Sequence, residues 1–258
     1  MACILLDIDG VLHVSGEPIS GVPEAVSELR HGGHALRFVT NNSTRPRARL
    51  AEELRTMGYA VEPEELQTTP GAAVRELAGK RVLALVMPAI VSDLEGLELV
   101  GEGAHAVLIG GCDETLEPNQ GFSYMNLARA FAEIQMGAEL YCLHKNRWWQ
   151  TSRGPLLDAG AFVAGLEYTT GVEATVLGKP SPAYFASALD ALGAEPELTW
   201  LVGDDAEADI RPAQLFGMRT ALVRTGKFRP DTLEGFDVTP DVVLSSIADL
   251  PGWLERSG

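Results

Sequence analysis

Two aspartates, Asp7 and Asp9, directly follow a short apolar segment, Cys3–Leu6. Side chains two residues apart in a strand point to the same face, so we expect both carboxylates on one side. Two such charges close together need a cation. Together with Asp204, which follows another apolar segment, they predict an all-oxygen cluster that suits Mg²⁺ better than Zn²⁺. A single aspartate at a strand end is as often a helix cap or a turn residue, so the prediction depends on the combination.

Polar residues that suit a phosphoryl group occur at two further places. Thr40 and Asn41 follow a second apolar segment and offer a hydroxyl, a side-chain amide and main-chain N–H groups. Lys179, in a Gly-Lys-Pro turn, brings a positive charge that can neutralise a bound phosphoryl group. The alternatives are that Asn42 or Ser43 only caps the next helix and that Lys179 is only solvated.

The elements that must position these residues have the pattern of an α/β fold. Short apolar runs alternate with amphipathic stretches that carry helix-start and helix-stop residues, such as Pro23 with Gly32 and Pro182 with Gly193. This pattern predicts βαβ units in a doubly wound parallel sheet, which binds ligands beyond the carboxyl ends of its strands. The expected strands are Cys3–Leu6, Leu36–Val39, Trp200–Val202 and Thr220–Val223.

A second α/β layer is expected inside the chain, because the stretch before Lys179 has strand-like and helical segments of its own. We therefore predict a Rossmann-like core of residues 1–78 and 179–258, with an inserted α/β cap domain of residues 79–178. The expected elements of the insert are the strands Val82–Val86, Ala106–Gly110 and Leu140–Leu143 and the helix Met125–Met136.

The composition narrows the class of protein. The chain has 258 residues, 46% of them hydrophobic, and a formal net charge of −16 without a Lys/Arg-rich run. A general nucleic-acid or anionic-membrane surface is therefore not expected. Three widely spaced cysteines fit neither a disulfide framework nor a zinc site, the amino terminus lacks a basic region, and Pro88 interrupts the longest apolar run. These features predict a soluble, cytoplasmic protein.

Four motifs of the chain resemble those of the haloacid dehalogenase superfamily of phosphotransferases, in the branch whose large α/β cap lies between the second and third motifs. The resemblance extends over nearly the whole chain. Three further segments are similar to a subgroup of phosphatases that act on phosphoramidates and pyrophosphate. The motifs are Asp7–Val11, Phe38–Ser43, Gly178–Pro182 and Gly203–Asp205 with Asp209, and the further segments are Phe122–Tyr124, Gly165–Tyr168 and Arg224–Pro230.

This resemblance implies a Mg²⁺-dependent phosphohydrolase. Asp7 would attack phosphorus and form an aspartyl-phosphate, while Asp9 would act first as general acid and then as general base. Mg²⁺ would be held by the Asp7 carboxylate, the Asp9 main-chain carbonyl and the Asp204 carboxylate. Asp209 would support the metal's water shell or the lysine, whereas Asp205 fits the first turn of a helix equally well. The residues expected to bind phosphoryl oxygens are Thr40, Asn41, Asn42 and Lys179.

The expected substrates are small phosphorylated compounds, either phosphoramidates such as phospholysine and phosphohistidine, or pyrophosphate. Small metabolite monoesters are the alternative within the same chemistry. A catalytically silent binding protein that keeps the fold is another alternative, although Asp7 and Asp9 are both intact. A cap that covers the site would exclude water and folded-protein substrates. The resemblance also implies a homodimer formed through the cap.

Two other segments carry unusual residues. His144–Trp149 combines cationic and aromatic side chains, which either contact the leaving group of the substrate or belong to ordinary packing and solvation. Gly101–Ala106 formally fits the dinucleotide-binding fingerprint, but the strand-like run Val107–Gly110 follows it where a helix is required. A nucleotide redox role is therefore not expected.

Overall fold

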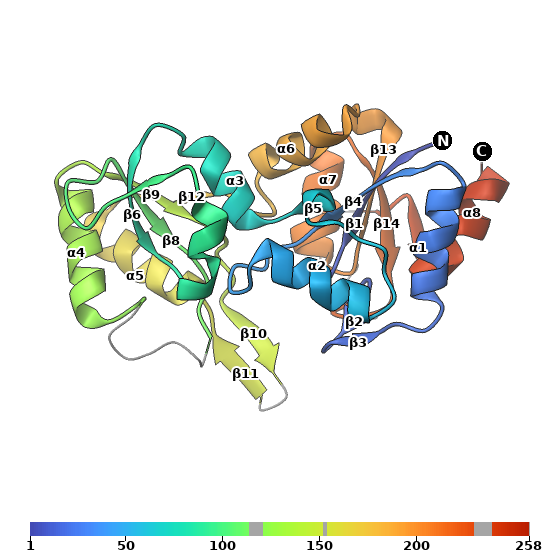
Figure 1. Cartoon of the computed structure of the whole chain (residues 1–258), viewed down its shortest axis with the longest axis horizontal. Coiled ribbons are helices and arrows are strands. Elements are labelled where there is room, and N and C mark those ends of the chain that lie inside the picture. The colour runs from blue at the N-terminus through green and yellow to red at the C-terminus, as the bar shows by residue number, and fades with distance from the viewer. Residues whose placement is uncertain (114–120, 152–153, 230–238, 258) are drawn as a thin grey trace. The chain divides into compact units, whose positions relative to one another are not determined.

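The computed structural model describes residues 1–113, 121–151, 154–229 and 239–257, which form two compact units (Figure 1). The first unit comprises Met1–Thr40, Ala48–Gln67 and Lys179–Gly258, and the second comprises Asn41–Arg47 and Thr68–Gly178. Each unit is an α/β structure built on its own parallel sheet, in agreement with the predicted fold class.

The first unit contains a six-stranded parallel sheet with the order β15-β14-β13-β1-β4-β5. Strand β1 lies inside the sheet, with β4 on one side and β13 on the other, so the winding direction changes beside it. Doubly wound sheets bind ligands at this switch point. The strands are β1 (Cys3–Asp7), β4 (Ala35–Val39), β5 (Leu66–Gln67), β13 (Thr199–Gly203), β14 (Arg219–Val223) and β15 (Val242–Leu244), and the hairpin β2 (His13–Val14) and β3 (Glu17–Pro18) follows β1.

Helices cover both faces of this sheet (Figure 1). On one face, Ile4 and Leu6 of β1 pack in a common apolar core with Val26 of α1 and Leu54 of α2. Helices α6 and α7 contact β4 and β14 on the other. The helices are α1 (Val22–His31), α2 (Arg47–Thr56), α6 (Pro182–Leu192), α7 (Arg211–Leu215) and α8 (Leu250–Ser257), with the short turns η1 (Pro63–Glu65), η3 (Pro196–Leu198), η4 (Ala206–Ile210) and η6 (Ile247–Asp249).

The second unit is a three-layer structure around a parallel sheet of order β12-β9-β8-β6-β7. Consecutive residues of β8 belong to different apolar cores. Leu108 packs with Ala73 of α3 on one face, and Val107 packs with Ile134 of α4 on the other. This unit contains α3 (Thr69–Glu76), β6 (Arg81–Leu85), η2 (Pro88–Leu94), β7 (Glu98–Leu99), β8 (Ala106–Ile109), α4 (Tyr124–Gln135), β9 (Glu139–Cys142), the antiparallel hairpin β10 (Trp148–Thr151) and β11 (Gly154–Leu157), α5 (Gly160–Thr170) and β12 (Thr175–Val176).

The division between the units differs from the expected boundary at residue 78. Helix α3 belongs to the second unit, because Ala73 and Leu77 share an apolar core with Val82 of β6. Residues 41–47 also belong to this unit, which ends at Gly178.

The expected strands of both units and the expected helices are present. Strand β8 begins at Ala106, the last residue of the Gly101–Ala106 segment, where a dinucleotide site requires a helix. Within the described ranges, no helix has both the length and the apolar character needed to span a bilayer.

Candidate active site

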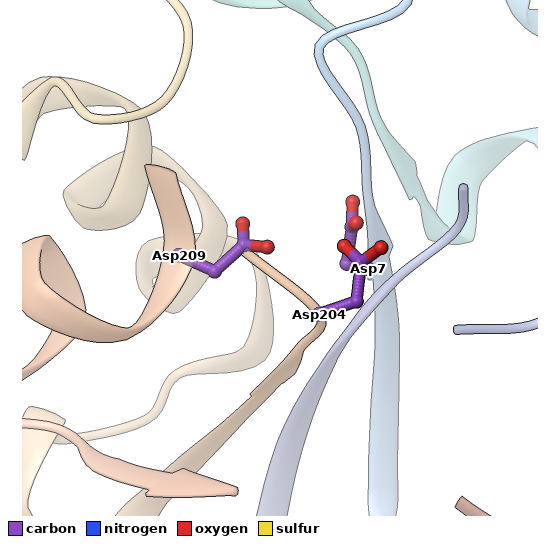
Figure 2. A group of neighbouring side chains, drawn as sticks. All are labelled: Asp7, Asp204 and Asp209. Atoms are coloured by element: carbon purple, nitrogen blue, oxygen red, sulfur yellow. The ribbon is translucent and has the colours of Figure 1, made fainter. Parts of the chain in front are cut away.

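Three buried carboxyl groups come together at the carboxyl ends of β1 and β13 in the first unit (Figure 2). Asp7 ends β1, Asp204 directly follows β13, and Asp209 lies in the turn η4. One oxygen atom of each carboxylate lies within 4.8 Å of the other two. The parallel arrangement explains this proximity, since β1 and β13 are neighbours in register and end at the same edge of the sheet.

Lys179 supplies a buried positive charge to this cluster. Its Nζ donates hydrogen bonds to Asp7 Oδ1 at 2.6 Å and to Asp209 Oδ1 at 2.7 Å. Burial raises the pKa of Asp7 well above its usual value, against the attraction of Lys179. Burial alone would lower the pKa of Lys179, but Asp209 and Asp7 raise it well above the usual range. The ammonium group therefore stays charged. The raised pKa values of Asp7 and Asp204 reflect burial and mutual repulsion of the carboxylates, which a cation bound between them would relieve.

The carboxylate of Asp204 is fixed by main-chain atoms. A Cβ atom at either Gly10 or Gly226 would overlap its Oδ2 atom, so only glycine permits this approach. The N–H of Lys227 donates to the same oxygen at 2.6 Å. Burial, followed by repulsion from Asp209, raises the pKa of Asp204 to about 7.

Replacing Gly226 with alanine should therefore displace the Asp204 carboxylate. We expect Gly226→Ala to weaken Mg²⁺ binding by about tenfold or more, equivalent to the loss of roughly 1.4 kcal/mol of binding free energy. Isothermal titration with Mg²⁺ would measure this change.

Gly193→Ala is the matched control for backbone strain. Gly193 has φ of 59° beside 61° for Gly226, but a Cβ atom at Gly193 would meet no atom within 4 Å. Both variants should lose similar stability through the left-handed φ. Equal Mg²⁺ affinities in the two variants would show that Gly226 does not position Asp204.

Asp9 lies apart from the three buried carboxyl groups. Its side chain is 58% exposed, and its Oδ1 atom is 3.8 Å from Nε2 of His13. Strand β1 ends at Asp7, so the side-chain alternation from which we expected both carboxylates on one face does not extend to Asp9. Two groups of Asp9 would carry its predicted roles. Its main-chain carbonyl would bind Mg²⁺, and its exposed carboxyl group would act as general acid and base.

Thr40 lies in the first unit at the end of β4, and a tyrosine hydroxyl holds its main chain. The Thr40 N–H donates to the hydroxyl of Tyr184 at 2.9 Å, and that hydroxyl lies 2.6 Å from the carbonyl oxygen of Gln67, to which it donates. Sequence reasoning missed Tyr184. Its only signal was an aromatic residue two positions after the Gly178–Pro182 motif, which does not reveal a contact with β4.

Asn41 and Asn42 belong to the second unit. The side-chain oxygen of Asn42 accepts hydrogen bonds from the N–H groups of Thr44 and Arg45, at 3.2 and 2.9 Å, just before α2. These N–H groups lie in the turn before α2, which begins at Arg47, so the capping alternative and substrate binding by Asn41 and Asn42 both stay predictions.

Asp205 caps the turn η4, in agreement with the alternative that this residue lies at the start of a helix. Its Oδ1 atom accepts from the N–H groups of Glu207 and Ala208, both at 3.0 Å, and its Oδ2 atom pairs with Lys227 Nζ at 2.9 Å. These contacts, against the effect of burial, lower the pKa of Asp205. This carboxylate is therefore occupied by structural contacts. Lys227 belongs to the segment Arg224–Pro230, of which Pro230 lies outside the described residues.

The segment after β9 in the second unit has both buried and exposed side chains. His144 is buried, Lys145 pairs with Glu167 at 2.7 Å, and Trp148 at the start of β10 is 58% exposed. Trp148 therefore does not pack in the core of its unit, and a contact of this hairpin with substrate remains a prediction.

Comparisons with known proteins identify the family. A family model described as haloacid dehalogenase-like hydrolase matches residues 4–100, and a second model, HAD-hydrolase-like, matches residues 176–250. A curated protein of Xenopus laevis, phospholysine phosphohistidine inorganic pyrophosphate phosphatase, is 38% identical over 256 residues, which cover 95% of this chain and 91% of the relative. The chain belongs to the haloacid dehalogenase-like hydrolase family.

Solved structures of this family have the same fold. A p-nitrophenyl phosphatase from Archaeoglobus fulgidus superposes with a TM-score of 0.89 at 28% identity, over 98% of both chains. A glycerol phosphate phosphatase from Mycobacterium tuberculosis, solved in complex with magnesium, superposes with a TM-score of 0.86 at 28% identity, over 96% of this chain and 76% of that one. The predicted enzyme class, a phosphatase of the haloacid dehalogenase type, is confirmed by these matches. An aspartyl-phosphate mechanism with Mg²⁺ is typical of this family.

Proposed function

We propose that this phosphatase hydrolyses small phosphorylated compounds with Asp7 as its nucleophile. The observation that carries the proposal is the buried contact of Asp7 with Lys179, beside Asp204 and Asp209 at the switch point of the sheet. A buried carboxylate held at a strand end by an ammonium group is oriented for in-line attack on a phosphoryl group.

Each site residue of the first unit has a separate role in the proposed reaction. Asp7 forms a bond to phosphorus as the bond to the leaving group breaks. Asp9, whose exposed carboxyl group can reach solvent and substrate, gives its proton to the leaving group and then takes one from the water that hydrolyses the aspartyl-phosphate. Lys179 stabilises negative charge on the phosphoryl oxygens, with Asp209 holding the lysine in place. Thr40, fixed by Tyr184, offers a hydroxyl to the same oxygens.

The acidic cluster fits Mg²⁺. Its donors are carboxylate oxygens, its charge is uncompensated by the one lysine, and Asp204 is held by glycine backbones in a fixed orientation. Asp7, the main-chain carbonyl of Asp9 and Asp204 would hold the ion, and Asp209 would support its water ligands. When bound, Mg²⁺ would neutralise charge on the transferring phosphoryl group.

Mg²⁺ affinity should depend on pH through Asp204. Its pKa of about 7 in the metal-free enzyme means that protons compete with the cation below that pH, because only the ionised carboxylate binds Mg²⁺. Titration of Asp204 should raise the apparent association constant with pH, by up to about tenfold per unit below pH 7, and contribute no further rise above it, while the raised pKa of Asp7 adds to the pH dependence. Calorimetric titrations across this range would test the expectation, and a flat profile would contradict it.

The substrate class is inferred from the relatives. The Xenopus laevis relative is named for phospholysine, phosphohistidine and pyrophosphate, whereas the two structural relatives are named for small monoesters. Phosphoramidates and pyrophosphate are the proposed substrates of this chain, with small metabolite monoesters as the alternative. A phosphate-release screen across the three classes, run beside Asp7→Asn, tests both. Activity on folded phosphoproteins with none on compact compounds would contradict the proposal.

The second unit is proposed to act as a cap over the active site. We further propose that the protein forms a homodimer through this unit and that it is located in the cytoplasm. The exposed hairpin residue Trp148 is the feature of this unit best suited to touch a leaving group. Light scattering over a dilution series would measure the oligomeric state, and a monomer at every micromolar concentration would count against the dimer.

A further inference from the structure

The segment that carries two predicted phosphate-binding residues is anchored inside the second unit. Asn41–Arg47 is part of that unit by its contacts. The carbonyl oxygen of Asn42 accepts a hydrogen bond from Thr69 Oγ1 at 3.2 Å, and the N–H of Arg47 donates to Asp93 Oδ2 at 2.6 Å. The conformation of Asn41 and Asn42 is therefore set by residues from other parts of the second unit.

Ser43 is the most buried anchor of this segment. Its side-chain oxygen lies 2.7 Å from Nε2 of His144 and accepts a hydrogen bond from the N–H of Gly111 at 3.0 Å. Ser43 and His144 are 2% and 3% exposed. A Cβ atom at Gly111, two residues after β8, would overlap the serine oxygen, so this position must be glycine for Ser43 to lie there.

The surroundings of His144 show which atom is the donor in its hydrogen bond with Ser43. Burial, against the attraction of Asp158, lowers the pKa of His144, so the ring is neutral and carries one N–H. The N–H of Asn146 points to Nδ1 at 3.4 Å, which makes Nδ1 an acceptor and leaves the proton on Nε2. Nε2 therefore donates to the Ser43 oxygen.

This arrangement is not a nucleophilic triad. In a Ser-His-Asp triad the serine and the carboxylate contact opposite nitrogens of the ring. Here Asp158 Oδ1 lies 3.8 Å from Nε2, the same nitrogen that contacts Ser43. The buried serine oxygen also accepts from Gly111, so it serves as a fixed acceptor.

We infer that His144 is a positioning residue for phosphate binding: its hydrogen bond to Ser43 holds the main chain from which Asn41 and Asn42 project. The inference rests on the proposed function and extends it, because it assigns the geometry of a phosphate-binding segment to a histidine of the inserted unit. Loss of this bond should weaken phosphoryl binding although neither His144 nor Ser43 touches the substrate.

The test uses the full chain with Mg²⁺, p-nitrophenyl phosphate as substrate, and orthovanadate as a phosphoryl analogue. We expect His144→Leu and Ser43→Ala each to weaken vanadate inhibition about tenfold, the effect of losing roughly 1.4 kcal/mol. The double variant should be no worse than either single one, because both remove the same bond. His144→Gln can donate from its amide and should recover most of the affinity.

Glu133→Gln controls for general destabilisation of the second unit. Glu133 is buried and accepts from the N–H groups of Gly103 and Ala104, far along the chain from residues 41–47. We expect it to lower the melting temperature and leave vanadate affinity unchanged. Normal vanadate affinity in both Ser43→Ala and His144→Leu, or an equal loss in Glu133→Gln, would overturn the inference. Normal turnover by Asp7→Asn would instead overturn the proposed function itself.

Discussion

The Asp7→Asn variant should lose turnover by about 10⁴-fold or more, the scale expected when a covalent nucleophile is removed. Asparagine has nearly the same shape but cannot form the aspartyl-phosphate. Phosphate release from p-nitrophenyl phosphate, measured at saturating Mg²⁺, would give the ratio of kcat values. The fold should be retained, because β1 and its register with β4 and β13 do not depend on the carboxylate.

Circular dichroism and thermal unfolding of Asp7→Asn would establish that its fold is intact. Asp205→Asn is the matched comparison, because Asp205 also follows a strand at this edge of the sheet, caps η4 and is given no part in the chemistry. A comparable loss of turnover in both variants would mean that charge or loop structure, and not the Asp7 nucleophile, limits the reaction.

The Lys179→Met variant should lose both activity and stability. Methionine fills a similar volume, but it removes both hydrogen bonds from a lysine that is only 5% exposed. We expect kcat to fall about 10²- to 10³-fold, as when one donor to a developing oxyanion is removed. Without metal, the free energy of unfolding should fall by about 3 to 5 kcal/mol, since buried carboxylates lose their partner. Urea unfolding in the presence of a chelator would measure the second effect.

Lys80→Met provides the control for Lys179→Met. Lys80 pairs with Glu139 at the surface of the second unit, where solvent weakens the interaction. Its removal should cost under about 1 kcal/mol and leave kcat unchanged. Wild-type turnover by Lys179→Met would contradict the assignment of Lys179 to the phosphoryl group.

The core of the fold was predictable because its signals are local. Buried parallel strands are continuous apolar runs, and β1, β13 and β14 each contain one, whereas Arg37 interrupts the apolar residues of β4. Parallel strands also bring their carboxyl ends to one edge, so the proximity of Asp7 and Asp204 followed from the pattern once the strands were assigned. Lys179 was singled out by its motif, and its Nζ contacts Asp7, whereas its role in phosphate binding stays a prediction.

The remaining features depend on contacts between residues far apart in the sequence. Helix α3 has an amphipathic pattern that fits either unit, and only the packing of Leu77 shows which sheet it covers. Tyr184 and His144 could equally have been ordinary core residues, because their hydrogen-bond partners are 144 and 101 residues away. Strand β1 ends at Asp7, so strand alternation does not apply to Asp9, and the placement of its carboxylate on the same side as that of Asp7 stays a prediction.

Chemical trapping of the aspartyl-phosphate tests the central claim most directly. The enzyme would be mixed with substrate and Mg²⁺, quenched in acid during turnover, and reduced with borohydride, which converts an acyl-phosphate of aspartate to homoserine. Mass spectrometry of the peptide that begins the chain should then find homoserine at position 7, only when substrate is present. Reduction at another carboxylate, or none at any while phosphate is released in a burst, would contradict Asp7 as the nucleophile.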